Sequence, residues 1–551
     1  MSVETPADAT GTTTAPVCRA YHQVSAHQLT RFAPGPEYLD WSDQPSPFRH
    51  YKGAPVVVLP RPVWPQAPGW HDMHIGAVPP CTIDLTSLSR FLALAAGLSL
   101  WKSQGEDRWS LRNNPSSGNL HPVEWYLSAS QVDGLAEGLY HYNAFYHTLE
   151  QRSDQPLCSP GSQEPQIKLA LSVCLPRTLW KYGERALRYS ELDTGHALGS
   201  LSFAAIALGW RGRAEGAVSG QVLTRWLGLD RKADFAGRAE RESARCLVSI
   251  DCHQHGGKPF RPEAAPTGST VWTGQANRLG ERSLFRWKSA TAATRASNAP
   301  VPWPQQARCA DRPPARRPNH PAGMTLIRQR RSARVLDPSY TCSLATFRGV
   351  LRCLLPDAST VWTVRDGFAP RVHLLVVVHA VEGMKPGLYF LPRHREATAA
   401  FQKAGAEMDL DPAVLSDDLP LISMHNGNLR SWSRACGCHQ SLVGNSAFSL
   451  IMLGEFDRTL TECGEGGYRQ LHHEAGLLGQ IAYLEANARG LGASGVGCFF
   501  DEEIDKLVGL TDTRFQSLYV FAIGQAVSDE RLEMGLAWPQ QHYSPDGNAS
   551  D

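Results

Sequence analysis

Val132-Asp-Gly-Leu-Ala-Glu-Gly-Leu-Tyr140 returns as Val381-Glu-Gly-Met-Lys-Pro-Gly-Leu-Tyr389 in a chain of 551 residues. Each copy follows a β-type run, 125–129 in the first case and 373–378 in the second. A strand, a glycine-containing turn and a second strand are typical of a β-hairpin. The pattern therefore predicts one fold that occurs twice in the chain.

Two long helices are predicted downstream of the hairpins, over 188–210 and 469–491. The first contains Gly195-His-Ala-Leu-Gly199 and the second contains Gly476-Leu-Leu-Gly479. Gly195, Gly199 and Ser202 share one helical stripe, where small side chains permit close backbone approach. Because glycine lowers helix propensity, its presence implies a packing role, and we expect a central helix–helix seam. Two homologous halves predict an intramolecular pseudodimer, the fused equivalent of a twofold dimer.

The residues between the halves differ in composition. From 253 to 323, proline and arginine accumulate and apolar periodicity ends, as is typical of a linker. The basic run 308–317 within it is expected to be solvated, with an anionic partner as the alternative. The predicted organisation is a disordered tail over 1–17, a first domain over 18–252, the Pro/Arg-rich linker over 253–323, a second domain over 324–536 and a tail over 537–551.

Composition and charge exclude some classes of binding partner. The chain has 54 Lys and Arg against 53 Asp and Glu, a net charge of +1, so no overall field attracts nucleic acid or an anionic membrane. No apolar run approaches the roughly 18 residues of a membrane span, and no signal peptide is recognisable. We therefore expect a cytoplasmic protein whose partners include neither nucleic acid nor a membrane.

The 13 cysteines are scattered, without a Cys-x-x-Cys pair. A chain of this length does not need disulfides to fold, so reduced thiols are expected. Cys436-Gly-Cys438-His439 could hold a soft metal, but a closed tetrahedral site needs four ligands and no second cluster offers them. We predict a loop with two free thiols there, and no metal site in the protein.

Two further motifs each occur in one half alone. The first half contains Pro115-Ser-Ser-Gly-Asn119, whose residues offer hydroxyl, amide and backbone donors to a polar planar ligand but also form ordinary turns. The second half lacks this motif at 361–371. It contains Arg330-Arg-Ser-Ala-Arg334, whose counterpart 73–78 has no arginine. Clustered guanidinium groups bind phosphate, although an arginine run is often a solvated face.

Lys181 and Tyr182 precede the first long helix, whereas Glu462 and Cys463 stand at the matching positions of the second half. Such a pair transfers protons when burial or a neighbouring cation lowers one pKa. The alternative is a dipeptide without a function.

Together these motifs resemble the nitroreductase superfamily and, within it, SagB-type dehydrogenases, which include azoline oxidases. Further matching stretches are Tyr21-His22, Leu39-Asp40-Trp41, Pro45-Ser-Pro-Phe48 and Lys181-Tyr-Gly-Glu-Arg-Ala-Leu-Arg-Tyr189. The resemblance implies an α+β fold of two nitroreductase-like domains, each with a central antiparallel or mixed sheet flanked by helices. It also implies FMN at the interface, between an Arg-Arg-Ser-x-Arg segment and a Pro-Ser-Ser-x-Asn segment. One composite site is then complete, and the second, from 73–78 and 362–371, is lost.

The resemblance assigns catalysis to Lys181 and Tyr182. The expected FMN contacts are Pro115, Ser116, Ser117, Gly118, Asn119, Arg330, Arg331, Ser332, Arg334, Gly495, Val496, Gly497 and Arg531. Glycines at 495 and 497 let backbone amides approach the flavin edge. Histidines 121, 196, 472 and 473 show no metal spacing, and His196 is expected to be a packed, hydrogen-bonded residue of the seam.

The resulting expectation is an FMN-dependent oxidoreductase that oxidises an azoline or related carbon. Its substrate is a modified peptide or a small heterocycle, and a cyclodehydratase-type protein is the expected partner. One alternative is an NAD(P)H-dependent nitro, quinone or enone reductase, which needs an open cleft rather than the Lys-Tyr pair. Another is a non-catalytic scaffold subunit of a peptide-modifying complex.

Overall fold

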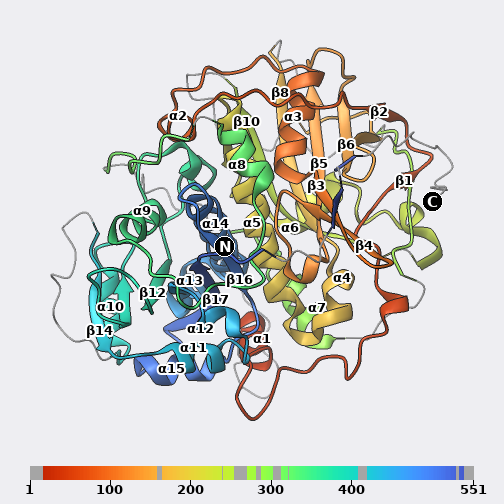
Figure 1. Ribbon diagram of the computed structural model, residues 1–551. Coiled ribbons are helices and arrows are strands. Elements are labelled where there is room, and N and C mark those ends of the chain that lie inside the picture. The colour runs from red at the N-terminus through yellow and green to blue at the C-terminus, as the bar shows by residue number, and fades with distance from the viewer. Residues whose placement is uncertain are drawn as a thin grey trace, which may run out of the picture.

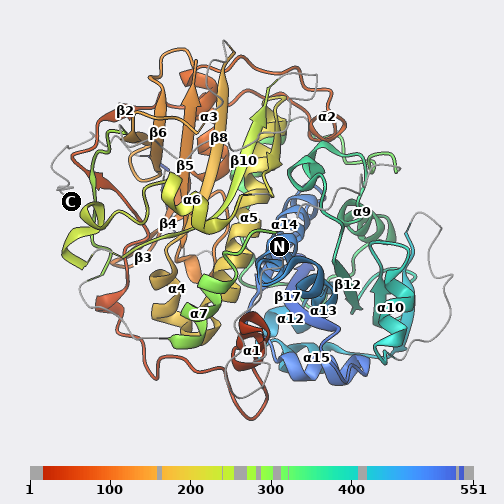
Figure 2. The ribbon, with the colours of Figure 1, turned by 180° about the vertical axis from the view of Figure 1, so that it is seen from behind.

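The computed structural model describes residues 16–157, 164–216, 218–238, 240–252, 270–280, 287–301, 312–320, 322–406, 419–528, 533–535 and 537–538. Each half contains one large sheet, and two long helices lie between them at the centre of the molecule (Figures 1 and 2). In both halves helices flank the sheet. The predicted α+β fold with two domains in one chain is confirmed.

The two sheets share one strand order. The first is β2 (Val56–Val58), β7 (Thr148–Ser153), β6 (Gly138–Asn143), β5 (Val123–Ser130), β8 (Gln166–Val173), β10 (Ser243–Asp251) and β9 (Arg211–Ala214). The second is β14 (Ile422–Asn426), β13 (Gly387–Leu391), β12 (Val372–Val378), β15 (Phe448–Glu455), β17 (Phe515–Gly524) and β16 (Gly492–Val496). All neighbouring strands are antiparallel, and both predicted hairpins, β5–β6 and β12–β13, are present.

The helices divide between the halves. The first half has α1 (Val17–Val24), α2 (Trp70–Ile75), α3 (Leu85–Ala96), α4 (Leu175–Tyr182), α5 (Ala186–Ala207), α6 (Gly220–Trp226) and α7 (Lys288–Ala296). The second has α8 (Gly323–Gln329), α9 (Leu344–Leu354), α10 (Ala397–Lys403), α11 (Arg430–Cys436), α12 (Ser441–Gly444), α13 (Phe456–Cys463), α14 (Gly466–Asn487) and α15 (Asp501–Val508). Short 3-10 helices include η1 (Trp41–Asp43), η2 (Ser117–Asn119) and η5 (Thr360–Arg365).

Helices α5 and α14 form the predicted seam. All 22 residues of α5 are buried, and its charged residues Arg188, Glu191 and Asp193 each have a hydrogen-bond or ion-pair partner. A Cβ atom at Gly195 would lie 2.7 Å from the Gly476 Cα atom and would collide with the His473 carbonyl. A Cβ atom at Gly199 would lie 2.6 Å from the Gln480 side chain. The glycines therefore permit the close approach that the repeat predicts.

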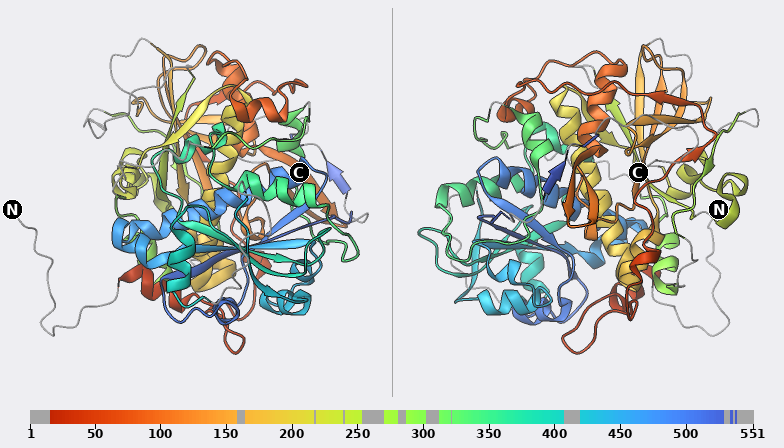
Figure 3. Two further views of the ribbon diagram at one scale, coloured as in Figure 1. Left: turned by 90° about the vertical axis from the view of Figure 1, so that its left-hand side faces the viewer. Right: turned by 45° about the vertical axis from the view of Figure 1, so that its right-hand side comes forward.

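Each end of the described chain packs on the opposite half. In α1, the Cys18 amide donates to Glu465 Oε2 at 2.8 Å, and the Tyr21 and Tyr468 rings lie 5.7 Å apart. At the other end, β18 (Glu533–Gly535) pairs antiparallel with β3 (Leu98–Gln104), which pairs with β4 (Asp107–Arg112). Figure 3 shows this dark blue strand beside the orange strands of the first half. The halves are therefore joined at both ends as well as at the seam.

Two expectations need correction. Arg317, within the basic run, is buried rather than solvated, because its Nε donates at 2.7 Å to Glu485, a buried carboxylate of α14 that needs a cation. Cys438 is bonded to Cys498, so the prediction of two free thiols is wrong for Cys438, whereas Cys436 is free and buried. The fold brings the two chain positions together across 60 residues of sequence, which spacing along the chain does not reveal.

Several predicted segments are only partly described. Within the predicted linker, α7 packs on the first half, where the Ala290 amide donates to Glu184 Oε2 at 2.6 Å. Residues 1–15, 253–269, 302–311 and 539–551 lie outside the described part of the chain. None of the helices in the described part has the length and apolarity needed to cross a bilayer.

Candidate functional site

A tight turn over 115–119 connects β4 to β5 and passes through the left-handed region at Gly118, where φ is 62°. Asp193, on α5, accepts hydrogen bonds from the Ser116 hydroxyl (2.7 Å), the Ser117 amide (2.9 Å) and the Ser117 hydroxyl (2.9 Å). Asp193 is almost completely buried, and burial raises its pKa to about 7. One buried carboxyl therefore holds the turn in place.

The same contacts change what the turn offers to a ligand. Both serine hydroxyl hydrogens point to Asp193, so the hydroxyls do not offer the donors expected from the composition. Ser116 Oγ also accepts from the His121 amide at 2.8 Å. The buried Oδ1 atoms of Asn113 and Asn114 have no hydrogen-bond partner among the described residues. Donors on a ligand would therefore find acceptors here.

Lys181 and Tyr182 lie against this turn. A Cβ atom at Gly118 would collide with the Tyr182 hydroxyl and would lie 3.2 Å from Lys181 Nζ. Burial lowers the pKa of Lys181 and raises the pKa of Tyr182 well above its ordinary value. Lys181 Nζ also lies 5.6 Å from the ring centroid of Trp41, an indole that is 63% exposed. The structure thus brings the Lys-Tyr pair to the Pro-Ser-Ser-Gly turn.

Arg330, from the second half, reaches the same region. Its Nε donates to the Asn113 carbonyl at 3.1 Å, and its Nη2 donates to the Arg112 carbonyl at 3.4 Å. The guanidinium carbon lies 5.0 Å from the Tyr483 ring centroid. Arg330 is buried, and its Nη1 has no hydrogen-bond partner among the described residues. A buried cation with an unsatisfied donor destabilises the fold unless a ligand accepts the remaining hydrogen bond.

Two further arginines lie beside Arg330 in the sequence. Burial and the neighbouring cations Arg330 and Arg328 lower the pKa of Arg331 to about 10, and burial lowers the pKa of Arg328. Within the described residues, no carboxylate forms an ion pair with any of these three side chains. The cluster is therefore a region of uncompensated positive charge. Arg334, four residues beyond Arg330, is exposed.

The glycine loop of the second half adjoins this arginine segment. Ser332 Oγ is hydrogen-bonded to the Tyr483 hydroxyl at 2.8 Å, and the Gly495 amide donates to the same hydroxyl at 2.9 Å. Any Cβ atom at Gly495 would collide with the Tyr519 hydroxyl, and one at Gly497 would collide with the Tyr189 ring. Val496 between them is buried in the core of the second half. Both glycines are therefore required by the close approach of tyrosine rings.

A comparison with protein families identifies both halves of the chain. The Nitroreductase family model matches residues 81–237 and 327–525, together more than half of the chain. The chain belongs to the nitroreductase family. Both halves are members, so the duplication is one of whole nitroreductase domains.

Two individual relatives match shorter stretches of the chain. A protein of Methanocaldococcus jannaschii that is named as a nitroreductase, MJ1384, is 33% identical over 136 residues, which are 23% of this chain and 65% of that protein. The trifolitoxin-processing protein TfxB of Rhizobium leguminosarum bv. trifolii is 29% identical over 109 residues, 17% of this chain and 29% of that protein. The chain thus spans less than two thirds of the length of either relative.

One solved structure matches nearly the whole fold. The crystal structure of an Anabaena variabilis protein that bears the nitroreductase name superposes with a TM-score of 0.66 and 20% identity. The match covers 93% of this chain and all of that protein. At this identity the likeness shows the shared fold.

The counterparts of the two motifs, 73–78 and 362–371, overlap α2 and η5, and these two elements lie against each other. Trp70 and Phe203 stack with centroids 5.3 Å apart, and Trp70 is completely buried. Thr360, at the start of η5, donates to the carbonyls of Met73 (2.7 Å) and His74 (3.1 Å). Met73, His74 and Trp362 are buried here, whereas Ile75, Gly76 and Asp366 are exposed. These segments are therefore only partly core, and the loss of a second flavin site stays a prediction.

One residue cluster has metal-like spacing but is explained by hydrogen bonds. Ligand atoms of His373, His394 and Glu455 lie within 4.8 Å of one another. The Arg393 amide donates to His373 Nδ1 at 3.1 Å, so the ring proton is on Nε2, which faces Glu455 Oε1 at 3.2 Å as a donor. Arg371 also pairs with Glu455 at 2.9 Å. This network leaves no ring lone pair of His373 for a metal ion.

The described residues of the composite region fit FMN. An uncompensated arginine cluster, with the unpartnered Nη1 atom of Arg330, suits a phosphate, and the unpartnered Oδ1 atoms of Asn113 and Asn114 suit the polar edge of a flavin. Arg531, the remaining predicted contact, lies outside the described residues.

Three residues of this region were not singled out from the sequence: Asp193, Tyr483 and Tyr519. Tyr519 Oη lies 3.1 Å from Nε2 of His196, whose Nδ1 faces Gln480 at 3.3 Å, and this confirms the expectation for His196. The available signal was an acidic or phenolic side chain inside an otherwise apolar element, since such groups are seldom buried without a partner.

Proposed function

We propose that this nitroreductase-family chain is an FMN-dependent oxidoreductase with one composite flavin site. The carrying observation is the contact of Arg330, from the second half, with the backbone of Arg112 and Asn113, directly before the Pro-Ser-Ser-Gly turn of the first half. The absence of the arginine motif from 73–78 and of the Pro-Ser-Ser-Gly motif from 362–371 supports a single site per chain.

FMN would be held from both halves. Arg330, Arg331, Ser332 and Arg334 would bind the phosphate end, with Arg531 as a further predicted contact. The turn 115–119 and the loop 495–497 would line the ring. When bound, FMN supplies a two-electron acceptor. Asp193 fixes the turn before any ligand arrives, which lowers the ordering cost of binding.

Lys181 and Tyr182 would have different roles in the reaction. Burial lowers the pKa of Lys181, which makes the neutral amine easier to form than in an exposed lysine, and this amine would remove a proton from a substrate carbon. Tyr182, whose pKa burial raises, remains a neutral phenol that donates a hydrogen bond. A base of this kind is required for dehydrogenation, whereas reduction of a nitro group or quinone does not need one.

We further propose that the substrate is an azoline, or a related carbon, in a modified peptide, as in SagB-type dehydrogenases. The support is the Lys-Tyr pair beside the turn and the similarity, over 109 residues, to a trifolitoxin-processing protein. A cyclodehydratase-type protein that forms the azoline would be the partner.

The test compares Lys181→Met with Lys52→Met, which changes an exposed lysine on β1 (Tyr51–Lys52). Oxidation of a synthetic thiazoline peptide by the flavin-loaded protein is followed by the loss of two mass units. We expect Lys181→Met to retain FMN and lose turnover, while Lys52→Met behaves as wild type. NADPH-driven nitro reduction that survives Lys181→Met would favour a reductase. Failure to bind FMN after reconstitution would favour a scaffold.

A further inference from the structure

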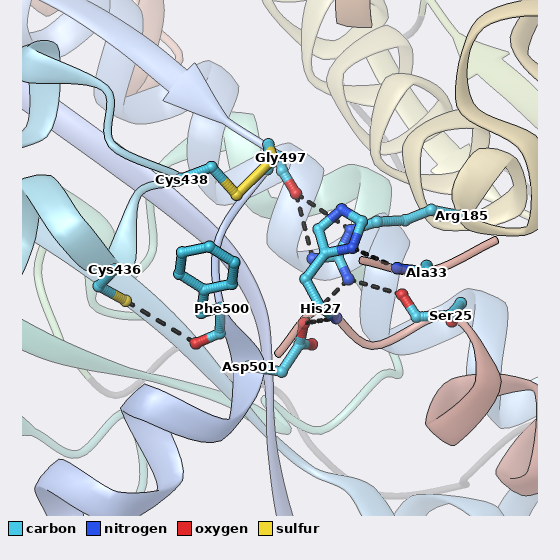
Figure 4. Close-up of a disulfide and its surroundings, with 10 residues drawn as sticks. Ser25, His27, Ala33, Arg185, Cys436, Cys438, Gly497, Phe500 and Asp501 are labelled. Carbon is cyan, nitrogen blue, oxygen red and sulfur yellow. Dashed lines mark hydrogen bonds and ion pairs between the residues drawn. A yellow bond between two sulfur atoms is a disulfide. The ribbon is translucent and has the colours of Figure 1, made fainter. Parts of the chain in front are cut away.

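The only disulfide among the described cysteines directly follows the glycine loop (Figure 4). Cys438 follows α11 and Cys498 follows Gly497, and their Cα atoms lie 5.9 Å apart. The other nine described cysteines are free. The bond is therefore not part of a general disulfide framework, and isolated bonds of this kind are often labile and regulatory.

The disulfide and the first half hold the same short segment, 497–501. The Gly497 carbonyl accepts hydrogen bonds from Arg185 Nε (3.3 Å) and Nη2 (3.2 Å). Asp501 accepts from Arg185 Nη1 at 2.9 Å and from the His27 amide at 2.9 Å. Figure 4 shows the disulfide on one side of Gly497 and Arg185 on the other. Covalent attachment thus positions the loop whose carbonyl Arg185 binds.

Arg185 links this segment to the candidate site. It follows the Lys181-Tyr182 pair by only a few residues, and the Tyr189 ring of the next helical turn limits Gly497 to glycine. The Tyr189 and Tyr182 rings lie 4.2 Å apart. Movement of Gly497 would therefore displace Tyr189 and, through it, Tyr182 beside the turn 115–119.

The backbone at Cys438 favours movement once the bond is broken. Cys438 and His439 have φ angles of 51° and 61°, which place two consecutive non-glycine residues in the left-handed region. Two backbone hydrogen bonds, from the His439 amide to the Ala435 carbonyl (3.3 Å) and from the Gln440 amide to the Gly437 carbonyl (3.1 Å), close this turn beside the covalent link. Once the link is broken, only these hydrogen bonds of the described chain oppose a return to the right-handed conformation that side chains prefer.

The bond is accessible to an external thiol. Cys438 and Cys498 are both half-exposed, whereas Cys436 is buried with its thiol directed to the Phe500 carbonyl. Burial also raises the pKa of Cys436, so this thiol does not act as an internal attacking group. The reductant is therefore supplied from outside, and a dithiol such as a thioredoxin-class protein can complete both exchange steps.

We propose that Cys438–Cys498 is a second redox centre, which exchanges with an external dithiol and thereby controls how tightly the loop 495–497 holds the flavin. One thiolate of the dithiol attacks a disulfide sulfur, the Cys438–Cys498 bond breaks, and a mixed disulfide forms. The second thiol of the reductant then displaces the remaining cysteine. The chain gains two electrons and two protons, and the reductant is oxidised to its disulfide. The effect on flavin rests on the function proposed above.

The experiment uses the full chain, air-oxidised and after treatment with dithiothreitol or a reduced thioredoxin. Flavin fluorescence gives the FMN dissociation constant, and hydrogen exchange reports on 490–501. We expect reduction to weaken FMN binding by about tenfold, through loss of preorganisation, and to speed exchange in that segment. Cys438→Ser/Cys498→Ser should behave as reduced protein under all conditions. Cys463→Ser, at a half-exposed free cysteine, should respond as wild type.

Equal exchange of 490–501 in the two redox states, with reduction verified by mass spectrometry, would overturn the proposal. So would air-oxidised protein without a Cys438–Cys498 linked peptide. If neither state binds FMN, the proposed function fails, while the exchange of 490–501 still decides whether the bond controls the loop.

Discussion

Replacing Asp193 with asparagine should separate flavin affinity from the stability of the fold. The carboxamide keeps one acceptor oxygen but directs an amino group toward the donors of Ser116 and Ser117. Leaving a buried donor without its acceptor costs about 1 to 3 kcal/mol. If this free energy is lost from FMN binding, the FMN dissociation constant rises about 5- to 150-fold, at roughly 1.4 kcal/mol per tenfold.

The pH dependence of folding stability should be weaker in this variant than in the wild-type protein. Burial raises the pKa of Asp193 from 3.8 to about 7, so between these values the folded protein holds a proton that the unfolded chain has lost. Stability therefore declines as pH rises through this window, by about 4 kcal/mol at most, at roughly 1.4 kcal/mol per pKa unit. Asparagine does not ionise, so the variant should lose less stability between pH 4 and pH 8.

Two assays check this pair of effects: flavin fluorescence titration at pH 8, and thermal unfolding of the flavin-free proteins across the pH range. Asp505, whose pKa burial also raises to about 7, titrates in both proteins and cancels in the comparison. An unchanged FMN dissociation constant, or the same pH dependence of unfolding in variant and wild type, would refute the role assigned to Asp193.

Further predictions concern the arginine cluster, a buried ion pair and the seam. Arg331→Ala should weaken FMN binding by about 1.5 to 3 kcal/mol, the usual contribution of a hydrogen bond to a charged group, and equal flavin content in equilibrium dialysis would contradict this. Asp501→Ala leaves Arg185 and Arg188 without their shared carboxylate, so unfolding should become easier by about 3 to 5 kcal/mol in denaturant titrations. Because these arginines lower the pKa of Asp501, its stabilisation should be present above pH 4 and should fall away as pH drops through that lowered value. Gly195→Val should lower the melting temperature, since its Cβ would collide with α14, whereas Gly35→Ala has room and should not.

Local patterns predict much of this fold. The two hairpins and the two glycine-bearing helices follow from short stretches whose periodicity and turn residues act within one element. The division of the two motifs between the halves is also visible, because Pro115-Ser-Ser-Gly-Asn119 and Arg330-Arg-Ser-Ala-Arg334 are each contiguous in the sequence.

Contacts between distant segments are not predictable in the same way. Asp193, on α5, supports the turn 115–119, and the sequence around Asp193 does not indicate this contact. Arg317 looks solvated within a proline-rich run, yet a carboxylate on α14 neutralises it. The partner of Cys438 lies 60 residues away. In each case the deciding interaction is set by tertiary packing.

The crossing of the terminal segments has a consequence for how the molecule is made. Helix α1 completes the surface of the second half, and strand β18 completes a sheet of the first, so neither domain is whole when synthesised alone. Translation as one polypeptide guarantees a one-to-one ratio of the two domains, and no mispaired homodimer competes during assembly. Separately expressed domains should therefore recover the fold only when they are produced together.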